Sequence, residues 1–168
     1  MLLCEVMSTY STVPSFRKLL QGGLAGFVAT APMSVSMLIG WMLLPKREKY
    51  PLPPRLITGK VTERLGIKNR LSEDQLAALT VLSHFGYGAL FGSIYTYFDQ
   101  KIRMDPAMKG AFAGLWLWAG SYLGWLPAAG ILRSAIHHPW RRNLLMIVAH
   151  LIWGVTLGEL TQKLTSGD

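Results

Sequence analysis

The chain has 168 residues, of which 51% are hydrophobic and only 15% are charged, and its formal net charge is +8. A soluble domain usually carries about a quarter charged residues, so this composition indicates an integral membrane protein. The cations lie outside the apolar stretches and match no nucleic-acid-binding motif, which argues against a nucleic-acid partner.

Four apolar stretches predict an all-α membrane protein with four transmembrane helices arranged as a four-helix bundle. Three of them contain no Asp, Glu, Lys or Arg, and each exceeds the about 20 residues that cross a bilayer as a helix. The fourth, 143–158, is shorter and spans only if Glu159 and Lys163 snorkel or face a polar interior. We therefore predict a single membrane domain over residues 1–168, with spans at about 19–45, 75–98, 109–132 and 141–162.

The first span carries Pro32 within Thr30-Ala31-Pro32-Met33-Ser34. Proline inside a helix removes one backbone hydrogen bond and kinks the helix. We expect a kink at Pro32, with the hydroxyls of Thr30 and Ser34 partly satisfying the freed carbonyls. The kink serves either helix packing or the shaping of a ligand cavity.

Residues 46–74 form the one long polar insertion, between the first and second spans. The Pro-rich run 50–54 favours an extended path, and residues 54–65 predict a short amphipathic helix with Gly66 as its stop. The apolar face of this helix is formed by Ile57, Val61 and Leu65. A basic amphipathic helix beside a span usually lies along the lipid headgroups, and docking onto a partner subunit is the alternative.

Helix-start signals place the remaining spans. The second span opens on a capping-box pattern, Ser72-Glu73-Asp74-Gln75, and the third on Asp105-Pro106, a cap followed by proline at the first helical position. Pro127 should bend the end of the third span. The fourth opens near His138-Pro139, and we expect Arg141 and Arg142 beside it to contact the headgroups.

Lysine and arginine near the ends of spans set the orientation of a membrane protein, because they are retained on the cytoplasmic side. Eleven of the 17 Lys and Arg residues fall on the side that holds the 45–74 loop, and six fall on the other side. We therefore predict that this loop is cytoplasmic and that both termini lie outside.

A nine-residue pattern occurs twice, at His84–Gly92 and at His150–Gly158. In each copy the histidine is followed by glycines at i+4 and i+8, which a helix places on one face with it. The segments Gly22–Gly26 and Gly110–Gly114 also resemble each other. We therefore predict two helical hairpins of the same orientation, related by duplication, which would bring the two histidines to the same depth.

Three uses of this histidine and glycine face are open. Glycines at this spacing let two helices approach closely, so we expect helix packing at Gly88, Gly92, Gly154 and Gly158, with each histidine bonded to a neighbouring hydroxyl or carbonyl. His84 and His150 could instead bind haem b as axial ligands, or one of them could bind the magnesium of a chlorophyll. The third hypothesis is a small transporter or proton conductor with a polar path near Thr30, Ser34, Ser121 and Glu159.

For catalysis the sequence offers little. Cys4 is the only cysteine, which excludes an intrachain disulfide and a cysteine-based metal cluster. No carboxylate pair lies within a span, and the chain has no phosphate-binding loop and no metal-ligand cluster. We expect a protein that is not an enzyme, without catalytic or metal-binding residues.

The run Ala31-Pro32-Met33, the Pro-rich segment 50–54 and the pattern His84-x-x-Tyr87-Gly88 resemble the YagU-like group of small bacterial membrane proteins. This resemblance extends from about Gln21 to Gly158 and implies a four-span protein of the bacterial inner membrane, without implying catalytic residues. Our leading hypothesis is a non-enzymatic scaffold or accessory subunit of a larger membrane complex, with the lipid bilayer and other membrane subunits as its partners.

Overall fold

The structure is a computed structural model that describes residues 14–99 and 101–166, so Cys4 lies outside the described residues. The described residues form helices joined by short segments, without a strand, and the predicted all-α class is confirmed. The helices are α2 (Phe16–Leu43), α3 (Pro53–Arg64), α4 (Glu73–Asp99), α5 (Pro106–Ala119), α6 (Leu126–Ala128) and α7 (Trp140–Thr165), and a π-helical segment, Gly120–Trp125, joins α5 to α6.

Three of these helices, α2, α4 and α7, are long and apolar enough to cross a membrane. Their ends lie within three residues of the predicted spans 19–45, 75–98 and 141–162. This agreement is compatible with the predicted multi-pass membrane protein.

The predicted third span, 109–132, is not one regular helix. α5 has 14 residues, fewer than the about 20 that cross a bilayer, and the π-helical segment and the single turn of α6 follow it. Pro127 lacks the N–H that would bond to the carbonyl of Leu123, and Gly124 has non-helical angles of φ −104° and ψ −107°. The irregularity expected near Pro127 therefore takes the form of a π-helical segment.

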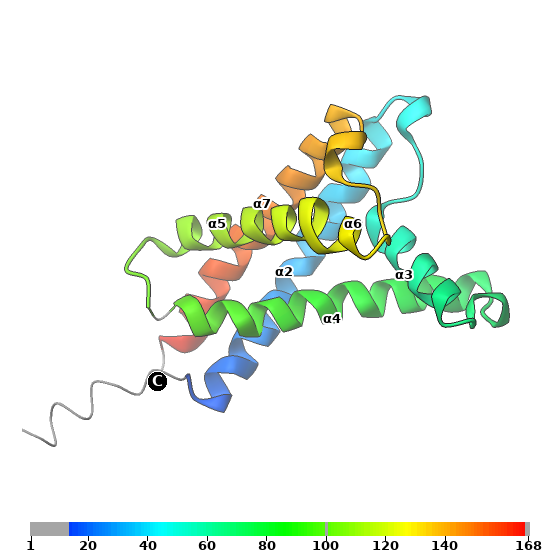
Figure 1. The fold of residues 1–168 in the computed structure, drawn as a ribbon. Coiled ribbons are helices and arrows are strands. Elements are labelled where there is room, and N and C mark those ends of the chain that lie inside the picture. Colours follow the sequence, from blue (N-terminus) through cyan, green and yellow to red (C-terminus); the bar gives the residue numbers. More distant parts are fainter. Residues whose placement is uncertain (1–13, 100, 167–168) are drawn as a thin grey trace, which may run out of the picture.

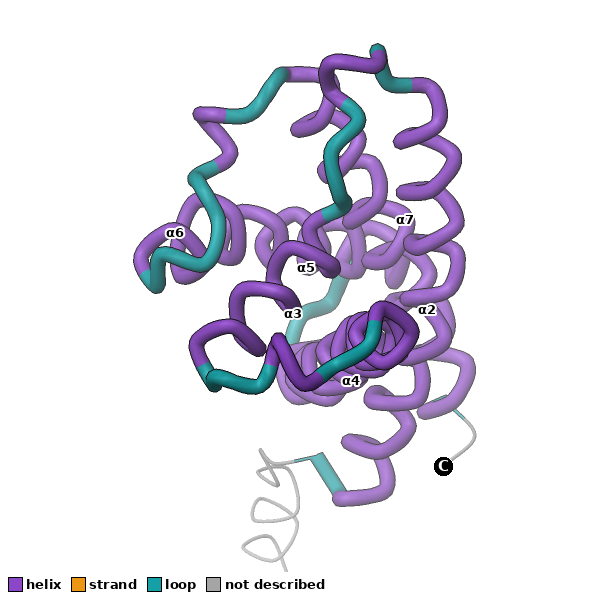
Figure 2. Tube along the Cα trace, turned by 90° about the vertical axis from the view of Figure 1, so that its right-hand side faces the viewer, coloured by secondary structure: helices purple, strands orange, loops and turns teal. Residues whose placement is uncertain are grey.

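The long helices pack as two antiparallel pairs, α2 with α4 and α5 with α7 (Figure 1). The pairs meet through α2 and α7, which lie side by side (Figure 2). The buried core follows this contact, with Ala25, Ala29, Met33 and Met37 from α2 and Met146, Ala149, Trp153 and Leu157 from α7. The result is two crossed pairs rather than the four-helix bundle that the spans predict.

Glycines form the contact within the α2–α4 pair. A Cβ atom on Gly26 would overlap the carbonyl oxygen of Gly88, and one on Gly92 would overlap the carbonyl oxygen of Gly22. Backbone atoms cannot move aside as a flexible side chain can, so a larger residue at these positions would push the helices apart.

The α5–α7 pair uses the same device, one helical turn out of register. A Cβ atom on Gly154 would overlap the carbonyl oxygen of Gly110, and one on Gly114 would overlap that of His150. In matched copies, Gly114 would correspond to Gly26 and would instead face Gly154 and Gly158. Each glycine face thus meets the partner within its own pair, and these contacts do not reproduce the predicted duplication.

Pro32 lies inside α2, which continues through it. The hydroxyl of Thr30 donates to the carbonyl of Gly26 at 2.8 Å, and the hydroxyl of Ser34 donates to the carbonyl of Thr30 at 2.7 Å. The carbonyl that Pro32 deprives of its helical donor belongs to Val28. The predicted use of these two hydroxyls is therefore wrong, and the kink at Pro32 stays a prediction.

The insertion folds back onto the ends of the long helices. α3 packs on α4 and places the Thr58 hydroxyl oxygen 3.1 Å from that of Ser83. Gly66 follows α3 with φ of 69°, the left-handed conformation that ends a helix at glycine, as predicted. Val61 and Leu65 are exposed, whereas Ile57 packs against the buried core, so only part of the predicted apolar face docks.

The predicted starts of α4 and α5 are confirmed. The Ser72 N–H donates to Gln75 Oε1 at 2.9 Å while the Gln75 N–H donates to Ser72 Oγ at 3.2 Å, which is a reciprocal capping box. At α5, the carboxylate of Asp105 accepts the N–H of Met108 at 3.1 Å.

At the start of α7, the prediction that Arg142 contacts the lipid headgroups is wrong. Arg142 is buried, and its guanidinium donates to the carbonyl oxygens of Glu48, Tyr50 and Pro51 at 2.9, 3.0 and 3.1 Å. The guanidinium carbon also lies 3.5 Å from the centroid of the Tyr50 ring. A Pro-rich run has few N–H donors of its own, so a charged side chain satisfies its carbonyls and holds the insertion against α7.

Candidate functional site

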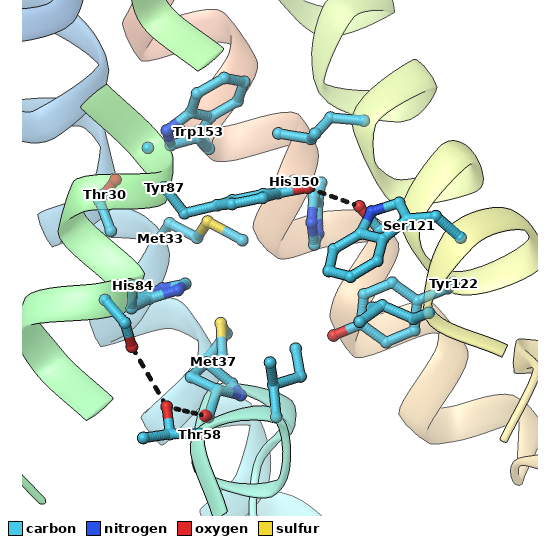
Figure 3. A pocket seen from close by; sticks show the side chains of 17 residues that line it. Thr30, Met33, Met37, Thr58, His84, Tyr87, Ser121, Tyr122, His150 and Trp153 are labelled. Atoms are coloured by element: carbon cyan, nitrogen blue, oxygen red, sulfur yellow. Dashed lines mark hydrogen bonds between the residues drawn. The ribbon is translucent and has the colours of Figure 1, made fainter. Parts of the chain in front are cut away.

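A cavity of about 170 Å³ lies between the two helix pairs (Figure 3). α4 forms one wall, α5 and the π-helical segment form the opposite wall, α2 and α7 lie behind, and α3 closes one end. The lining is mostly apolar and aromatic, with a few polar groups among them; it includes Thr30, Met33, Met37, Ile57, His84, Tyr87, Leu117, Ser121, Tyr122, Trp125, His150 and Trp153.

Both histidines that the repeated pattern singles out line this cavity, His84 from α4 and His150 from α7 (Figure 3). The glycines that follow them face other helices, and of these glycines Gly88 also lies on the cavity wall. The face that the sequence presents as one unit therefore divides in space, with the histidines on the cavity and the glycines in the helix contacts.

His150 is held by its own helix. Its Nδ1 lies 2.7 Å from the carbonyl oxygen of Met146, one turn earlier in α7. A carbonyl oxygen only accepts, so Nδ1 carries the proton and Nε2 presents its lone pair. The edge of the Tyr122 ring packs against the imidazole, with ring centroids 5.9 Å apart and planes at 86°.

His84 has no comparable anchor. Its Nε2 is buried and has no hydrogen-bond partner among the described residues. A buried polar atom without a partner costs about 1–3 kcal/mol, so a hydrogen-bonding group in the cavity would stabilise this nitrogen. The nearby ring contact is with the edge of Phe85, which offers no hydrogen bond.

One polar link crosses between the two pairs in front of the histidines. The Tyr87 hydroxyl on α4 lies 3.1 Å from the Ser121 hydroxyl in the π-helical segment. The Tyr87 ring also approaches the Trp125 ring, with centroids 6.5 Å apart. α4 otherwise packs mainly on α2 and α3, so the contacts of Tyr87 with Ser121 and Trp125 connect α4 to the opposite wall of the cavity.

The polar path of the transporter hypothesis is only half assembled. Thr30 and Ser121 line the cavity, whereas Ser34 and Glu159 do not. The Thr30 hydroxyl is engaged with the carbonyl of Gly26. The described residues also contain no group of three or more His, Cys, Asp or Glu side chains that could hold a metal ion.

Several cavity residues are not among the predicted site residues. Tyr87, Tyr122 and Trp153 are aromatic residues within predicted spans, where the sequence alone offers packing as their ordinary role. Trp153 donates from Nε1 to the carbonyl of Gly26 at 3.2 Å, which ties α7 to α2 behind the cavity. A signal for Tyr87 was its place three residues after His84, one helical turn along the same face.

Residues 34–158 match the family described as "Protein of unknown function (DUF1440)". The chain belongs to this family. The match confirms the resemblance to an uncharacterised family of the YagU-like kind, and it includes His84, Tyr87, Ser121 and His150, whereas Thr30 precedes it. No curated protein and no solved structure matches the chain.

Proposed function

We propose that this member of the DUF1440 family is a non-enzymatic membrane protein that binds a small, neutral, largely apolar ligand between its two helix pairs. The observation that carries the proposal is the cavity of about 170 Å³ itself, with aromatic and aliphatic walls and few polar groups. Ligand sites usually have this composition. The volume suits a ligand of one ring, because a cavity of about 150 Å³ engineered in another protein binds benzene.

Filling the cavity tests this proposal. Leu117→Trp places a large ring in the lining, and Leu123→Trp makes the same change at an exposed position nearby that is not in the lining. With the full chain in nanodiscs, we expect saturable fluorobenzene binding by fluorine NMR in the wild type and in Leu123→Trp, and its loss in Leu117→Trp. Absence of saturable binding in the wild type, or equal binding by both variants, would contradict the proposal.

We further propose an accessory-subunit role, favoured by the exposure of α4. In an apolar 18-residue stretch of α4 only 11% of the residues are buried, against 44% in the corresponding stretch of α7. Most of the surface of α4 therefore requires lipid or a protein partner. Leu90→Trp alters this exposed surface, and Leu24→Trp makes a matched change on α2. We expect a membrane partner to co-purify in mild detergent with the wild type and Leu24→Trp but not with Leu90→Trp; a lone monomer from all three counts against the role.

For topology, we propose that residues 106–139 make the fourth crossing of the bacterial inner membrane. Lys109 pairs with Asp99 at the end of α4, and Gln21 at the start of α2 donates to the carbonyl of Leu164 at the end of α7. Arg142, at the start of α7, instead contacts the loop after α2. The segment between Lys109 and Arg142 therefore has its two ends on opposite sides of the protein.

Cysteine labelling tests this topology. In a Cys4→Ser background, we expect an impermeant maleimide to label Lys101→Cys in intact cells, and Lys60→Cys only after permeabilisation, because the positive-inside rule places the 45–74 loop in the cytoplasm. Ile136→Cys should behave like Lys60→Cys if the fourth crossing exists. Labelling like that of Lys101→Cys would contradict the fourth crossing.

Haem b or chlorophyll ligation by His84 and His150 is a separate hypothesis that the cavity volume disfavours. A porphyrin is several times larger than the single ring that a cavity of about 150 Å³ accepts, so α4 and α7 would have to separate to admit it. The visible absorbance spectrum of the purified protein tests this, since a pigment lost on His84→Ala/His150→Ala substitution would establish it.

A further inference from the structure

The hydrogen bond that His150 already makes determines which hydrogen bond a ligand in the cavity can form with it. Its Nδ1–H donates to the Met146 carbonyl, which leaves the Nε2 lone pair as the acceptor of a neutral ring. A charged imidazolium would be costly in this buried position within a membrane-spanning helix, and no carboxylate lines the cavity to pair with it. The imidazole therefore offers an acceptor to whatever occupies the cavity.

Among the described residues, most hydroxyls around the cavity already donate to another group. Thr30 donates to the Gly26 carbonyl at 2.8 Å, Thr58 to the Pro54 carbonyl at 2.9 Å, and Tyr122 to the sulfur of Met146 at 3.6 Å. Tyr87 and Ser121 are paired with each other at 3.1 Å. None of these bonds reaches His150 Nε2, which is therefore available to accept a hydrogen bond from a ligand.

The rest of the lining favours an apolar ring. Tyr122, Trp153 and Leu117 line the cavity with aromatic and aliphatic surface, and the volume of about 170 Å³ matches a single ring. A carboxylate or an ammonium group would lose its hydration without gaining a counter-charge here. A hydroxyl can donate to the acceptor of His150, and the buried Nε2 of His84, which has no partner among the described residues, belongs to the same cavity lining.

We propose that the cavity ligand is a neutral aromatic alcohol, a phenol or hydroquinone ring, whose hydroxyl donates to Nε2 of His150. This inference rests on the proposed function, because it identifies the chemical class of ligand at the same cavity. The ring can arrive as a free phenol or as the head of a lipid hydroquinone, since both present the same hydroxyl to His150.

Three fluorinated rings of similar size test the class of ligand in nanodiscs by fluorine NMR. Para-fluorophenol carries the donor, para-fluoroanisole replaces its hydrogen by a methyl group, and fluorobenzene has no oxygen. We expect the wild type to bind para-fluorophenol about tenfold more tightly than the other two, the effect of one additional buried hydrogen bond. This comparison needs no substitution, so a variant that fails to fold does not affect it.

Two substitutions locate the donor's partner. His150→Leu should remove the preference for para-fluorophenol while fluorobenzene still binds, and His84→Leu should reduce the preference less. Equal binding of phenol and anisole by the wild type would overturn the inference and leave the proposed function standing, whereas failure of all three rings to bind would overturn both. Displacement of para-fluorophenol by a tailed hydroquinone in the nanodisc lipid supports the lipid source, and its retention supports a free phenol.

Discussion

The two copies of the repeated pattern, His84–Gly92 in α4 and His150–Gly158 in α7, have nearly the same sequence spacing and very different surroundings. α7 lies between α5 and α2, and 44% of its most apolar window is buried, whereas α4 has only 11% of its window buried. This difference shows that a glycine spacing specifies where a backbone can be approached but not which helix approaches it. It also shows that a histidine beside such a face takes its role from the space it enters.

The glycine contacts provide the largest expected difference between the copies. Gly154→Ala sets a Cβ against the backbone oxygen of Gly110 in the most enclosed helix, and we expect it to lower the free energy of unfolding by about 3 kcal/mol or more. Gly88→Ala should cost less, because its Cβ first meets the Thr30 side chain and α4 has fewer neighbours to disturb. Unfolding titrations in mild detergent measure both.

Gly86 supplies the control for this comparison. It lies in α4, and a Cβ atom added there would have no neighbouring atom within 4 Å, so Gly86→Ala should leave stability unchanged or raise it by about 0.5–1 kcal/mol. If Gly86→Ala destabilised the protein as much as Gly154→Ala, the loss would reflect glycine content and not helix contact.

The second-largest effect on stability is expected at the start of α7. Arg142→Gln at the start of α7 removes the donor to three carbonyls of the insertion, and we expect a loss of about 2–3 kcal/mol together with faster proteolysis of residues 45–53. Arg141→Gln is the matched control: Arg141 is exposed, its single contact with the insertion is 3.4 Å to Glu48, and its guanidinium otherwise lies 5.2 Å from the centroid of the neighbouring Trp140 ring, so it should cost less than Arg142→Gln. Equal effects would mean that Arg142 acts only as a surface charge.

Replacing each of the two histidines by leucine should change the stability of the protein in opposite directions. His84→Leu removes a buried nitrogen that has no partner and should raise stability by about 1 kcal/mol, whereas His150→Leu removes the bond to Met146 and should lower it by about 1 kcal/mol. Thermal unfolding of both variants without added ligand measures the difference. A shift of the same sign in both would show that the two imidazoles have equivalent surroundings.

The smallest expected effect lies at the start of α4. Ser72→Ala removes the side-chain acceptor of an exposed capping box and should lower the free energy of unfolding by about 0.5–1 kcal/mol. Ser72 bonds Gln75, whereas a Cβ at Gly154 meets Gly110, so the two sites share no partner and Ser72→Ala combined with Gly154→Ala should be additive. A cost comparable to that of Arg142→Gln would mean that the helix start contributes more than its local hydrogen bonds.

Much of this fold follows from local physics and could be predicted from the sequence. The apolar stretches predicted α2, α4 and α7, and the cap residues Ser72 and Asp105 predicted the starts of α4 and α5, because hydration of a side chain and a helix-end hydrogen bond depend on neighbours close in sequence. Gly66 was predictable as the end of α3 for the same reason.

The candidate site was predictable only in part. His84 and His150 stood out by their repetition, but their meeting at one cavity depends on how two helix pairs cross, and Tyr122 joins them there from the segment after α5. Arg142 was misplaced because its three acceptors lie some ninety residues away, in a run whose prolines cannot satisfy its carbonyls. The predicted span at 109–132 is not one regular helix, because it is interrupted near Gly124 and Pro127 by a π-helical segment that hydropathy does not register.

By itself the sequence indicated a membrane protein and determined the long helices and the glycine positions at which a helix can be closely approached, since each depends on composition or on spacing within one helix. Only the tertiary structure decided that Gly88 and Gly92 meet α2, that Gly154 and Gly158 meet α5, and that the histidines face a shared cavity. The physical reason is that close approach requires small residues on both partners, and α2 and α5 supply theirs in Gly22, Gly26, Gly110 and Gly114.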